Sequence, residues 1–425
     1  MFISNKGLLK NTDSTKFLNF EILPKVPTAV AKISSLVHLT SLWRFKERNP
    51  AHRIRAYNLL GSRRQKKIWA CEPFISTDYS IWKKCLIKVI SKRPLYECLL
   101  FSQYLTRVFM LRTHSYLFQE KLQLVLIPYK GHINENFGIY VWLAKKLKIK
   151  SVALQENWDN LASKSFILDE PDVFCVWGQQ SSGHLRAIQR LSETRIYIAG
   201  SPRFDRYWEQ DTNPPKVSLP DGTIITIYSP YILIAGIGSG LDHFVVSSLM
   251  EALDSLGNKT GEIKVVYRPH PESSNQSKNM QLISNKYPDV LFDVGDNARR
   301  FGHRESLIQN SLLTVCQLST MTLETLLVGK NTIAPLFSEN LEVRYGYKRI
   351  INEWVHLAPI AASPRLKLVE DKLQLKLALT QSLEDLSGKH ELSDWVCRKG
   401  AYLDHLKEML DKEYIFHDSE ISGNS

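Results

Sequence analysis

Arg268 and His270 stand in a short segment whose residue types suit phosphate, Tyr-Arg-Pro-His-Pro at 267–271. The two prolines fix the backbone on either side of His270 and remove N–H donors that could enter a strand ladder. A guanidinium binds phosphate well, and an imidazole that donates a hydrogen bond can stabilise a departing anion. The segment therefore predicts a phosphate site, and the alternative is a histidine that only caps a rigid turn.

A second segment with related chemistry runs from Ser319 to Glu324, directly after an apolar run. Ser319 and Thr320 supply hydroxyl groups at a predicted helix start, where free backbone N–H groups attract anions. Glu324 lies one turn further on, where a carboxylate could accept hydrogen bonds from ribose hydroxyls. We predict nucleotide contacts for all three residues, although serine or threonine at a helix start is also the ordinary N-cap.

Glycines alternate directly after the predicted strand 231–235, in Gly236-Ile237-Gly238-Ser239-Gly240. Glycine lets backbone N–H groups approach an anion closely, so Gly236, Gly238 and Ser239 join the predicted phosphate contacts. The spacing is neither a P-loop, which needs Gly-Lys-Ser/Thr, nor a complete GxGxxG fingerprint. A tight turn without a ligand is the alternative.

The first half of the chain offers two candidates for a general base, Asp159 and His132. Each lies in a loop after a predicted strand, where a carboxylate or an imidazole could deprotonate a hydroxyl group. Three further residues in such loops are predicted to contact the acceptor substrate, namely Trp158, Asn160 and Arg203. Asp159 could equally form a turn with Asn160, and His132 could be an ordinary surface histidine.

Apolar runs of strand length alternate with helical patterns, which is typical of parallel, doubly wound sheets. The predicted strands are residues 124–127, 151–154, 173–176 and 196–199 in the first half, and 231–235, 263–267, 290–293, 312–316 and 332–334 in the second. Helices are predicted at 137–147, 178–191, 241–256, 304–310, 321–327 and 392–410. Ligands of such sheets bind beyond the carboxyl ends of the strands, which is where the segments described above lie.

The turn-rich stretch 206–228 is predicted to be a linker between two domains. We therefore predict an α/β protein with two Rossmann-like domains and a cleft between them. The first domain, 1–210, begins with a basic helical region and binds the acceptor, and the second, 226–390, binds the nucleotide. Residues 391–425 are predicted to form a last helix and a polar tail that is disordered from about residue 416.

The 425-residue chain has the composition of a folded protein, with 44% hydrophobic and 23% charged residues, and a formal net charge of +12. This charge favours anionic partners such as nucleotides or a phospholipid surface, and we find no motif for binding nucleic acid. The six cysteines form no CxxC pair and no zinc spacing, which favours a reducing compartment. Without a visible signal peptide or an apolar stretch of about 20 residues, we predict a cytoplasmic protein. A peripheral position on the inner face of the plasma membrane stays open.

The second half of the chain resembles the donor domain of GT-B glycosyltransferases. The resemblance lies in three segments, residues 268–271, 319–324 and 329–330. The resemblance is to the bacterial surface-polysaccharide branch, with CDP-glycerol glycerophosphotransferases, capsule Kdo transferases and polysialyltransferases. In that branch the His-Pro step and the Ser/Thr helix start contact the phosphates of the donor. The resemblance therefore assigns phosphate contacts to His270 and to the helix start, and the ribose contact to Glu324.

The chain departs from the glycerophosphotransferases at one loop, because their Trp-His-Gly corresponds to Trp158-Asp159-Asn160 here. This alignment makes Asp159 the base and speaks against a CDP-glycerol donor. Residues 200–205 are similar to the Gly-x-Pro-Arg-x-Asp segment that closes the first domain of such enzymes. No Asp-x-Asp triplet occurs in the chain, so we predict a mechanism without a metal or other cofactor.

These features predict a glycosyltransferase that moves a sugar, or a polyol phosphate, from a nucleotide-activated donor to a hydroxyl group. The acceptor is expected to be a surface glycan or a lipid-linked glycan, as in capsule or lipopolysaccharide biosynthesis. Two other functions stay open: a sugar-nucleotide 2-epimerase of the same fold, and a non-catalytic protein that binds anions or a membrane surface.

Overall fold

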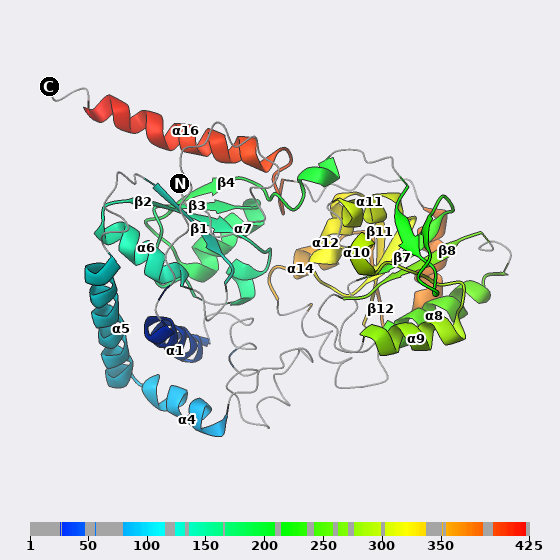
Figure 1. The fold of residues 1–425 in the computed structure, drawn as a ribbon, viewed down its shortest axis with the longest axis horizontal. Coiled ribbons are helices and arrows are strands. Elements are labelled where there is room, and N and C mark those ends of the chain that lie inside the picture. Colours follow the sequence, from blue (N-terminus) through cyan, green and yellow to red (C-terminus); the bar gives the residue numbers. More distant parts are fainter. Residues whose placement is uncertain are drawn as a thin grey trace. The chain divides into compact units, whose positions relative to one another are not determined.

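The computed structural model of the chain describes residues 26, 28–46, 56, 80–114, 124–131, 136–164, 166–208, 214–235, 242–257, 262–270, 276–298, 302–336, 351, 354–385 and 394–421. These residues fall into two compact units (Figure 1). Unit 1 comprises the described residues up to Pro202 and those from Asp394 onward, and unit 2 those between Arg203 and Ser393. Each unit has its own sheet of parallel strands with helical connections, which confirms the predicted class of two Rossmann-like domains.

Unit 1 is built on a four-stranded sheet with the order β1-β2-β3-β4, in which every neighbouring pair is parallel. All four strands lie where the apolar runs predict them. The strands are β1 (Leu124–Tyr129), β2 (Lys150–Gln155), β3 (Val173–Val176) and β4 (Arg195–Ile198). The connections contain α6 (Phe137–Lys146), a π-helical turn (Asn160–Lys164), and α7 (Gln179–His184) with a second π-helical turn (Leu185–Gln189).

Hydrophobic clusters cover both faces of the unit 1 sheet. On one face α6 packs against the strands through side chains such as Val141. On the other face α16 (Tyr402–Ile421) contributes Tyr402, Leu406 and Met409, which share one side of the helix. Figure 1 shows α16 along one side of the sheet and α6 on the other. The last helix of the chain therefore completes the core of unit 1.

This last helix begins and ends later than predicted, at Tyr402–Ile421 instead of 392–410. Asp394 and Gly400 have positive φ angles of 64° and 113°, which a right-handed helix cannot contain. The helix extends past residue 416, where the tail is predicted to begin, and ends at Ile421, so the disorder of the tail stays a prediction.

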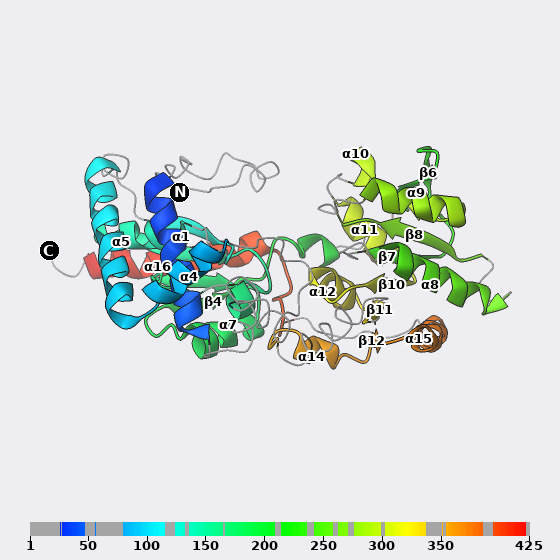
Figure 2. The same ribbon diagram turned by 90° about the horizontal axis from the view of Figure 1, so that it is seen from below.

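Three helices precede β1 among the described residues, namely α1 (Thr28–Arg44), α4 (Ile81–Ile90) and α5 (Arg93–His114). α1 contacts both α4 and α5, and Figure 2 shows the three helices grouped together. Arg107 of α5 makes a bidentate ion pair with Asp169, at 2.9 and 2.7 Å, which ties this helical group to the rest of unit 1. None of the described helices combines the length and the hydropathy that a membrane crossing requires.

Unit 2 contains an eight-stranded sheet with the order β12-β11-β10-β7-β8-β9-β5-β6. The six strands from β12 to β9 run parallel to one another. Their order is that of a Rossmann sheet, with the first of them along the chain, β7, in the middle. The strands are β5 (Lys216–Ser218), β6 (Ile224–Thr226), β7 (Tyr231–Ala235), β8 (Lys264–Arg268), β9 (Leu291–Phe292), β10 (Leu313–Cys316), β11 (Asn331–Pro335) and β12 (Leu366–Val369).

Helices cover both faces of the unit 2 sheet. The main hydrophobic cluster joins one face to α8 (Asp242–Asp254), α9 (Gln276–Lys286) and α15 (Lys372–Glu384). Figure 1 shows α11 (His303–Asn310) and α12 (Thr320–Leu327) on the side away from α8 and α9. Two short helices, α10 (Gly295–Ala298) and α14 (Ala358–Ala361), complete the unit.

Part of the stretch predicted as a linker is a β-hairpin. β5 and β6 pair antiparallel, and β5 extends the sheet beyond β9 through Ser218 and Phe292. Gly222, in the turn between the two strands, has a φ angle of 91°, which favours glycine. Strands of three residues are too short to show an alternating pattern, so the turn residues dominated the prediction. The sequence pattern did not indicate β12 and α15 either.

Candidate functional site

The strand order of unit 2 creates a switch point between β7 and β10. From β7 the sheet continues through β8 and β9 on one side, and from β10 through β11 and β12 on the other. At such a point the connections leave in opposite directions and open a crevice at the carboxyl ends of the strands, where ligands bind. The segments that follow these two strands are residues 236–240 and Gln317–Thr320. Gly236, Gly238 and Ser239 lie outside the described residues.

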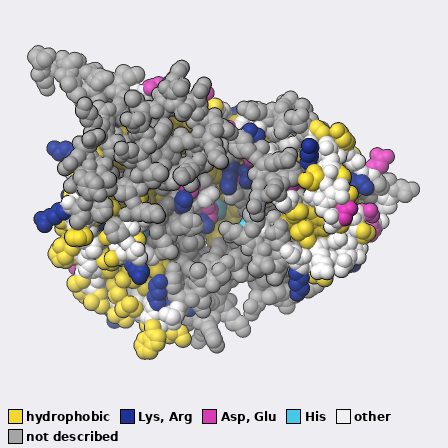
Figure 3. Space-filling model, in the orientation of Figure 1, with side chains coloured by type: hydrophobic (Ala, Val, Ile, Leu, Met, Phe, Trp, Pro, Cys, Tyr) yellow, Lys and Arg dark blue, Asp and Glu magenta, His cyan; other side chains and the backbone are white. Residues whose placement is uncertain are grey.

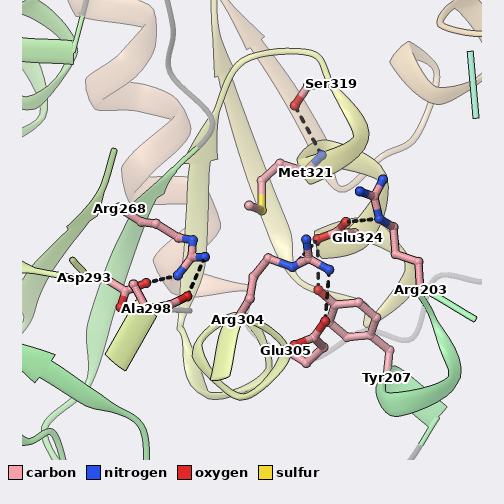
Figure 4. A network of polar contacts seen from close by, with 10 residues as sticks. All are labelled: Arg203, Tyr207, Arg268, Asp293, Ala298, Arg304, Glu305, Ser319, Met321 and Glu324. Atoms are coloured by element: carbon pink, nitrogen blue, oxygen red, sulfur yellow. Dashed lines mark hydrogen bonds and ion pairs between the residues drawn. The ribbon is translucent and has the colours of Figure 1, made fainter. Parts of the chain in front are cut away.

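The helix α12 begins at this edge with a capping box. Ser319 Oγ accepts a hydrogen bond from the Met321 N–H at 3.2 Å (Figure 4). Thr322 Oγ1 accepts one from the Ser319 N–H at 3.3 Å. Thr320, the first helical residue, is half-buried. The Ser319 hydroxyl therefore stabilises the helix start, and the positive end of the helix dipole is directed to the switch point.

Arg268, the last residue of β8, has its charge balanced within unit 2. Its guanidinium forms an ion pair with Asp293 and donates a hydrogen bond to the Ala298 carbonyl at 3.1 Å (Figure 4). Asp293 is buried, and its second oxygen lies 2.8 Å from Nε2 of His303. These contacts orient the Arg268 side chain and neutralise it, so its predicted contact with phosphate stays a prediction.

His270 is exposed two residues beyond the end of β8, close to the buried carboxyl of Asp242. Burial raises the pKa of Asp242, and a hydrogen bond from Tyr267 and the positive charge of His270 partly oppose this rise. Asp242 opens α8 and accepts hydrogen bonds from Tyr267 Oη at 2.7 Å and from Asn279 Nδ2 at 3.1 Å. The Asp242 carboxyl therefore ties α8, β8 and α9 together beside His270.

Glu324 is only 2% exposed and lies at the centre of a polar cluster within unit 2 (Figure 4). Its Oε2 atom accepts a hydrogen bond from Tyr207 Oη at 3.0 Å and lies 3.2 Å from Nε of Arg304. Arg304 also pairs with Glu305 at 2.9 Å. Burial and the charge of Glu324 hold the pKa of the Tyr207 hydroxyl well above its usual range, so this group stays a donor. A ribose contact by Glu324 would have to compete with these partners.

Arg203, which was predicted to face the acceptor, belongs to unit 2. Its Nε atom lies 3.6 Å from Oε1 of Glu324, and about one third of its side chain is exposed. This position groups Arg203 with the residues predicted to contact the nucleotide (Figure 4). Its predicted contact with an acceptor stays a prediction.

The loop after β2 in unit 1 contains the other residues predicted on the acceptor side. Trp158 is buried and donates a hydrogen bond from Nε1 to Gln180 at 2.7 Å. Asn160 is also buried, and its amide donates to the carbonyl of the last β1 residue at 2.7 Å. Asp159 pairs with Lys164 at 2.8 Å, and about one quarter of each side chain is exposed. Trp158 and Asn160 thus hold the loop in place, whereas Asp159 reaches solvent.

Glu156 directly follows β2 and was not identified from the sequence. Its carboxylate lies 3.8 Å from Nζ of Lys130 and is about one quarter exposed. Burial raises the pKa of Glu156, and Lys130 partly opposes this rise. A carboxylate with a raised pKa is a stronger base and therefore a better general base near neutral pH. His132, the alternative base, lies outside the described residues.

Sequence reasoning thus missed Asp242, Glu156, Tyr207 and Arg304. The first two carried a usable signal, since Asp242 follows the glycine-rich segment and Glu156 follows a strand. Tyr207 and Arg304 carried none, because they meet Glu324 only through tertiary packing. Within the part of the chain that the structure describes, no group of three or more His, Cys, Asp or Glu side chains could hold a metal ion.

No protein-family model matches the sequence, and a search of curated proteins finds no match. Among solved structures, the chain is similar to the UDP-GlcNAc 2-epimerase from Methanocaldococcus jannaschii, with 13% identity and a TM-score of 0.47 over 73% of this chain and 82% of that one. The UDP-GlcNAc 2-epimerase from Neisseria meningitidis, solved with UDP-GlcNAc bound, has 14% identity and a TM-score of 0.45, with coverages of 74% and 82%. A UDP-forming trehalose-phosphate synthase from Burkholderia xenovorans has 10% identity and a TM-score of 0.34, with coverages of 67% and 71%. These likenesses concern the α/β fold and reach no further.

Proposed function

We propose that unit 2 binds a nucleotide-activated sugar at its switch point, and that the protein transfers the sugar, or a polyol phosphate, to a hydroxyl group of a surface glycan or glycolipid. The observation that carries the proposal is the strand order, which brings the glycine-rich connection and the start of α12 to neighbouring strand ends. The start of α12 presents backbone N–H groups, which suit a diphosphate, and the glycine-rich residues 236–240, which lie outside the described residues, are expected to add more.

In this proposal His270 and the start of α12 bind the diphosphate. His270 is exposed beyond β8 and can donate a hydrogen bond to the leaving group as negative charge develops. Ser319 keeps the helix start ordered, and Thr320 offers its hydroxyl group. Arg268 is paired with Asp293, so it contributes by fixing the end of β8 more than by its own charge.

The loop after β2 is proposed to supply the general base for the acceptor hydroxyl. Asp159 is the residue that the family resemblance favours, but its carboxylate already pairs with Lys164 at 2.8 Å, and an acceptor hydroxyl would compete with this partner. Glu156, with its raised pKa, is the second candidate in the same loop. Replacing each residue separately by its amide and comparing turnover would show which one carries the proton.

Nucleotide binding is tested by a thermal-shift panel of CMP, CDP, UDP, GDP and TDP. Nucleotides with one particular nucleobase should raise the melting temperature selectively. A ligand at 100 times its Kd stabilises the folded state by about 2.7 kcal/mol. If none of the five nucleotides raises the melting temperature, unit 2 is not a donor-nucleotide domain.

Replacement of His270 by Ala should lower turnover about 100-fold or more while the fold is kept, because a hydrogen-bond donor to the developing charge is lost. The matched control is Lys264→Ala, since Lys264 is exposed at the opposite end of the same strand. Turnover measured with the nucleotide identified by the panel should be near normal in the control. Near-normal turnover in His270→Ala would contradict the site.

A sugar-nucleotide 2-epimerase is a second candidate, and the presence of two carboxylates, Glu156 and Asp159, in one loop favours it. Epimerisation needs acid and base groups near one sugar but no acceptor. UDP-GlcNAc should then be epimerised at C2 in the absence of an acceptor, with solvent deuterium incorporated at that carbon. Absence of both changes in a protein that binds UDP would favour transfer.

A further inference from the structure

Large hydrophobic side chains are exposed mainly on two helices of unit 1. Of the 17 such side chains exposed among the described residues, ten lie on α4 and α5. Figure 3 shows hydrophobic side chains gathered over these helices, at the lower left, with Lys and Arg side chains beside them. A continuous apolar surface of this kind ordinarily marks a contact with another apolar partner.

On α4 the exposed residues form a stripe. Trp82, Leu86 and Val89 follow one another at intervals of four and three residues, so they share one face of the helix. All three are at least half-exposed, and Trp82 reaches 86%. The α4 side chain that is fully buried is Ile87, which lies on a different face. α4 therefore turns only part of its apolar surface to the protein.

On α5 the usual pattern of a surface helix is only partly kept. Phe101, Leu105 and Phe109 lie four residues apart and are all more than half-exposed. The buried side of the same helix holds two polar residues, Gln103 and Arg107, beside the apolar Tyr96 and Met110. A helix of a soluble domain ordinarily places apolar residues inward and polar residues outward. The ion pair of Arg107 with Asp169 fixes this orientation, because it holds the polar side of α5 inward.

Basic residues accompany the exposed apolar side chains. Residues 80–114 contain seven Lys or Arg residues and a single acidic one, Glu97. Lys83, Lys92 and Arg112 are exposed. An apolar stripe bordered by lysine and arginine, with tryptophan and phenylalanine among the apolar residues, suits the interface of a bilayer that carries negative charge.

We propose that the face formed by α4 and α5 binds the surface of an anionic phospholipid bilayer. Trp82, Phe101 and Phe109 enter the headgroup region, and the basic side chains pair with lipid phosphates. A second copy of the chain fits this face poorly, because a two-fold contact would bring the same excess of positive charge together from both copies. The proposal does not depend on the proposed transfer reaction.

The first experiment is flotation of the full chain with vesicles. Vesicles of phosphatidylcholine with about one third phosphatidylglycerol should carry the protein upward, and vesicles of phosphatidylcholine alone should carry much less. Binding should weaken as salt is raised, since the phosphate contacts are screened. If the protein does not float with the anionic vesicles at low salt, the proposal is wrong.

Variants then test the face itself. Phe101→Ser with Phe109→Ser should lower the vesicle partition coefficient at least tenfold, since two exposed aromatic groups lose their apolar environment. The control is Leu373→Ser with Leu377→Ser on α15 of unit 2, where both residues are also more than half-exposed. This control should bind as the wild type does, and circular dichroism should show that both variants are folded.

Charge is tested by Lys83→Glu with Lys92→Glu, which should lower the partition coefficient about tenfold or more, because two charges attracted to the anionic surface become repelled by it. Lys278→Glu, an exposed position on α9, is the control. Light scattering after gel filtration should show the wild type as a monomer. A dimer that Phe101→Ser converts to a monomer would overturn the proposal and assign the face to a second copy.

Discussion

Two buried carboxylates of unit 2, Asp293 and Glu324, are paired with arginine, and Glu324 is the clearer case. Its carboxylate has contacts with Tyr207, Arg304 and Arg203, all supplied from other parts of unit 2. A buried carboxylate with these partners holds the start of unit 2 against α11 and α12. The same residue was predicted to bind ribose, so its structural role and its binding role have to be separated by experiment.

Replacing Glu324 by Gln should lower the free energy of unfolding of unit 2 by about 2–3 kcal/mol. Removing one partner of a buried ion pair costs about 3–5 kcal/mol, and the arginines here are about 30% exposed, which reduces the loss. Urea titration with hydrogen exchange of α12 peptides would measure the change.

The control for Glu324→Gln is Glu97→Gln, which breaks the exposed pair with Arg93 on α5. Exposed pairs contribute at most about 1 kcal/mol, so this variant should be close to the wild type. Equal losses in the two variants would mean that the cluster around Glu324 does not stabilise unit 2.

At the scale of single elements, the start of α12 has two roles. It is a stable helix end, and we propose that it binds phosphate. Ser319 and Thr322 cap each other's backbone, and this leaves the first turn ordered before any ligand arrives. A preorganised helix start binds an anion at a lower entropic cost than a disordered one. The cap is therefore expected to affect nucleotide binding as well as stability.

Ser319→Ala should destabilise the protein by about 1 kcal/mol and also weaken binding of the preferred nucleotide. Asp371→Ala removes a comparable cap, because the Asp371 side chain accepts from the Gln374 N–H at the start of α15. It should cost similar stability and leave nucleotide affinity unchanged. Calorimetric titration of both variants measures this difference, and equal affinities would assign Ser319 a purely structural role.

At the scale of the whole molecule, unit 1 contains two buried histidines whose pKa is lowered. His38 in α1 and His184 in α7 are both in unit 1, and burial lowers the pKa of each to about 4. Their Nδ1 atoms have no hydrogen-bond partner among the described residues. The folded unit 1 therefore favours the neutral form of both side chains, whereas the unfolded chain protonates them near pH 6.5.

Stability of unit 1 should fall as the pH is lowered from about 6.5 to about 4, because the unfolded chain then binds more protons than the folded one. The loss amounts to at most about 3 kcal/mol per histidine. Urea midpoints between pH 7.5 and pH 4.5 should show a flatter pH dependence for His38→Gln and for His184→Gln than for the wild type. An unchanged slope in both variants would contradict the assignment.

The sequence alone determined the alternation of strands and helices and the segments at the strand ends, because these depend on local patterns. The nine predicted strands are all present, and the described residues of both motifs, 267–270 and 319–324, lie at the ends of strands as expected. The hairpin β5–β6 was missed because its strands are short. The late start of α16 was missed because no local pattern indicates that Gly400 adopts a positive φ angle.

Only the tertiary structure decided the order of the strands, and with it the switch point between β7 and β10. It also decided the partners of the charged residues, since Arg268 meets Asp293 and Glu324 meets Tyr207 across many intervening residues. The outward apolar face of α5 depends in the same way on the pair formed by Arg107 and Asp169. The physical reason is common to all three: pairing between distant residues depends on how the elements pack, and local sequence patterns hold no information about that packing.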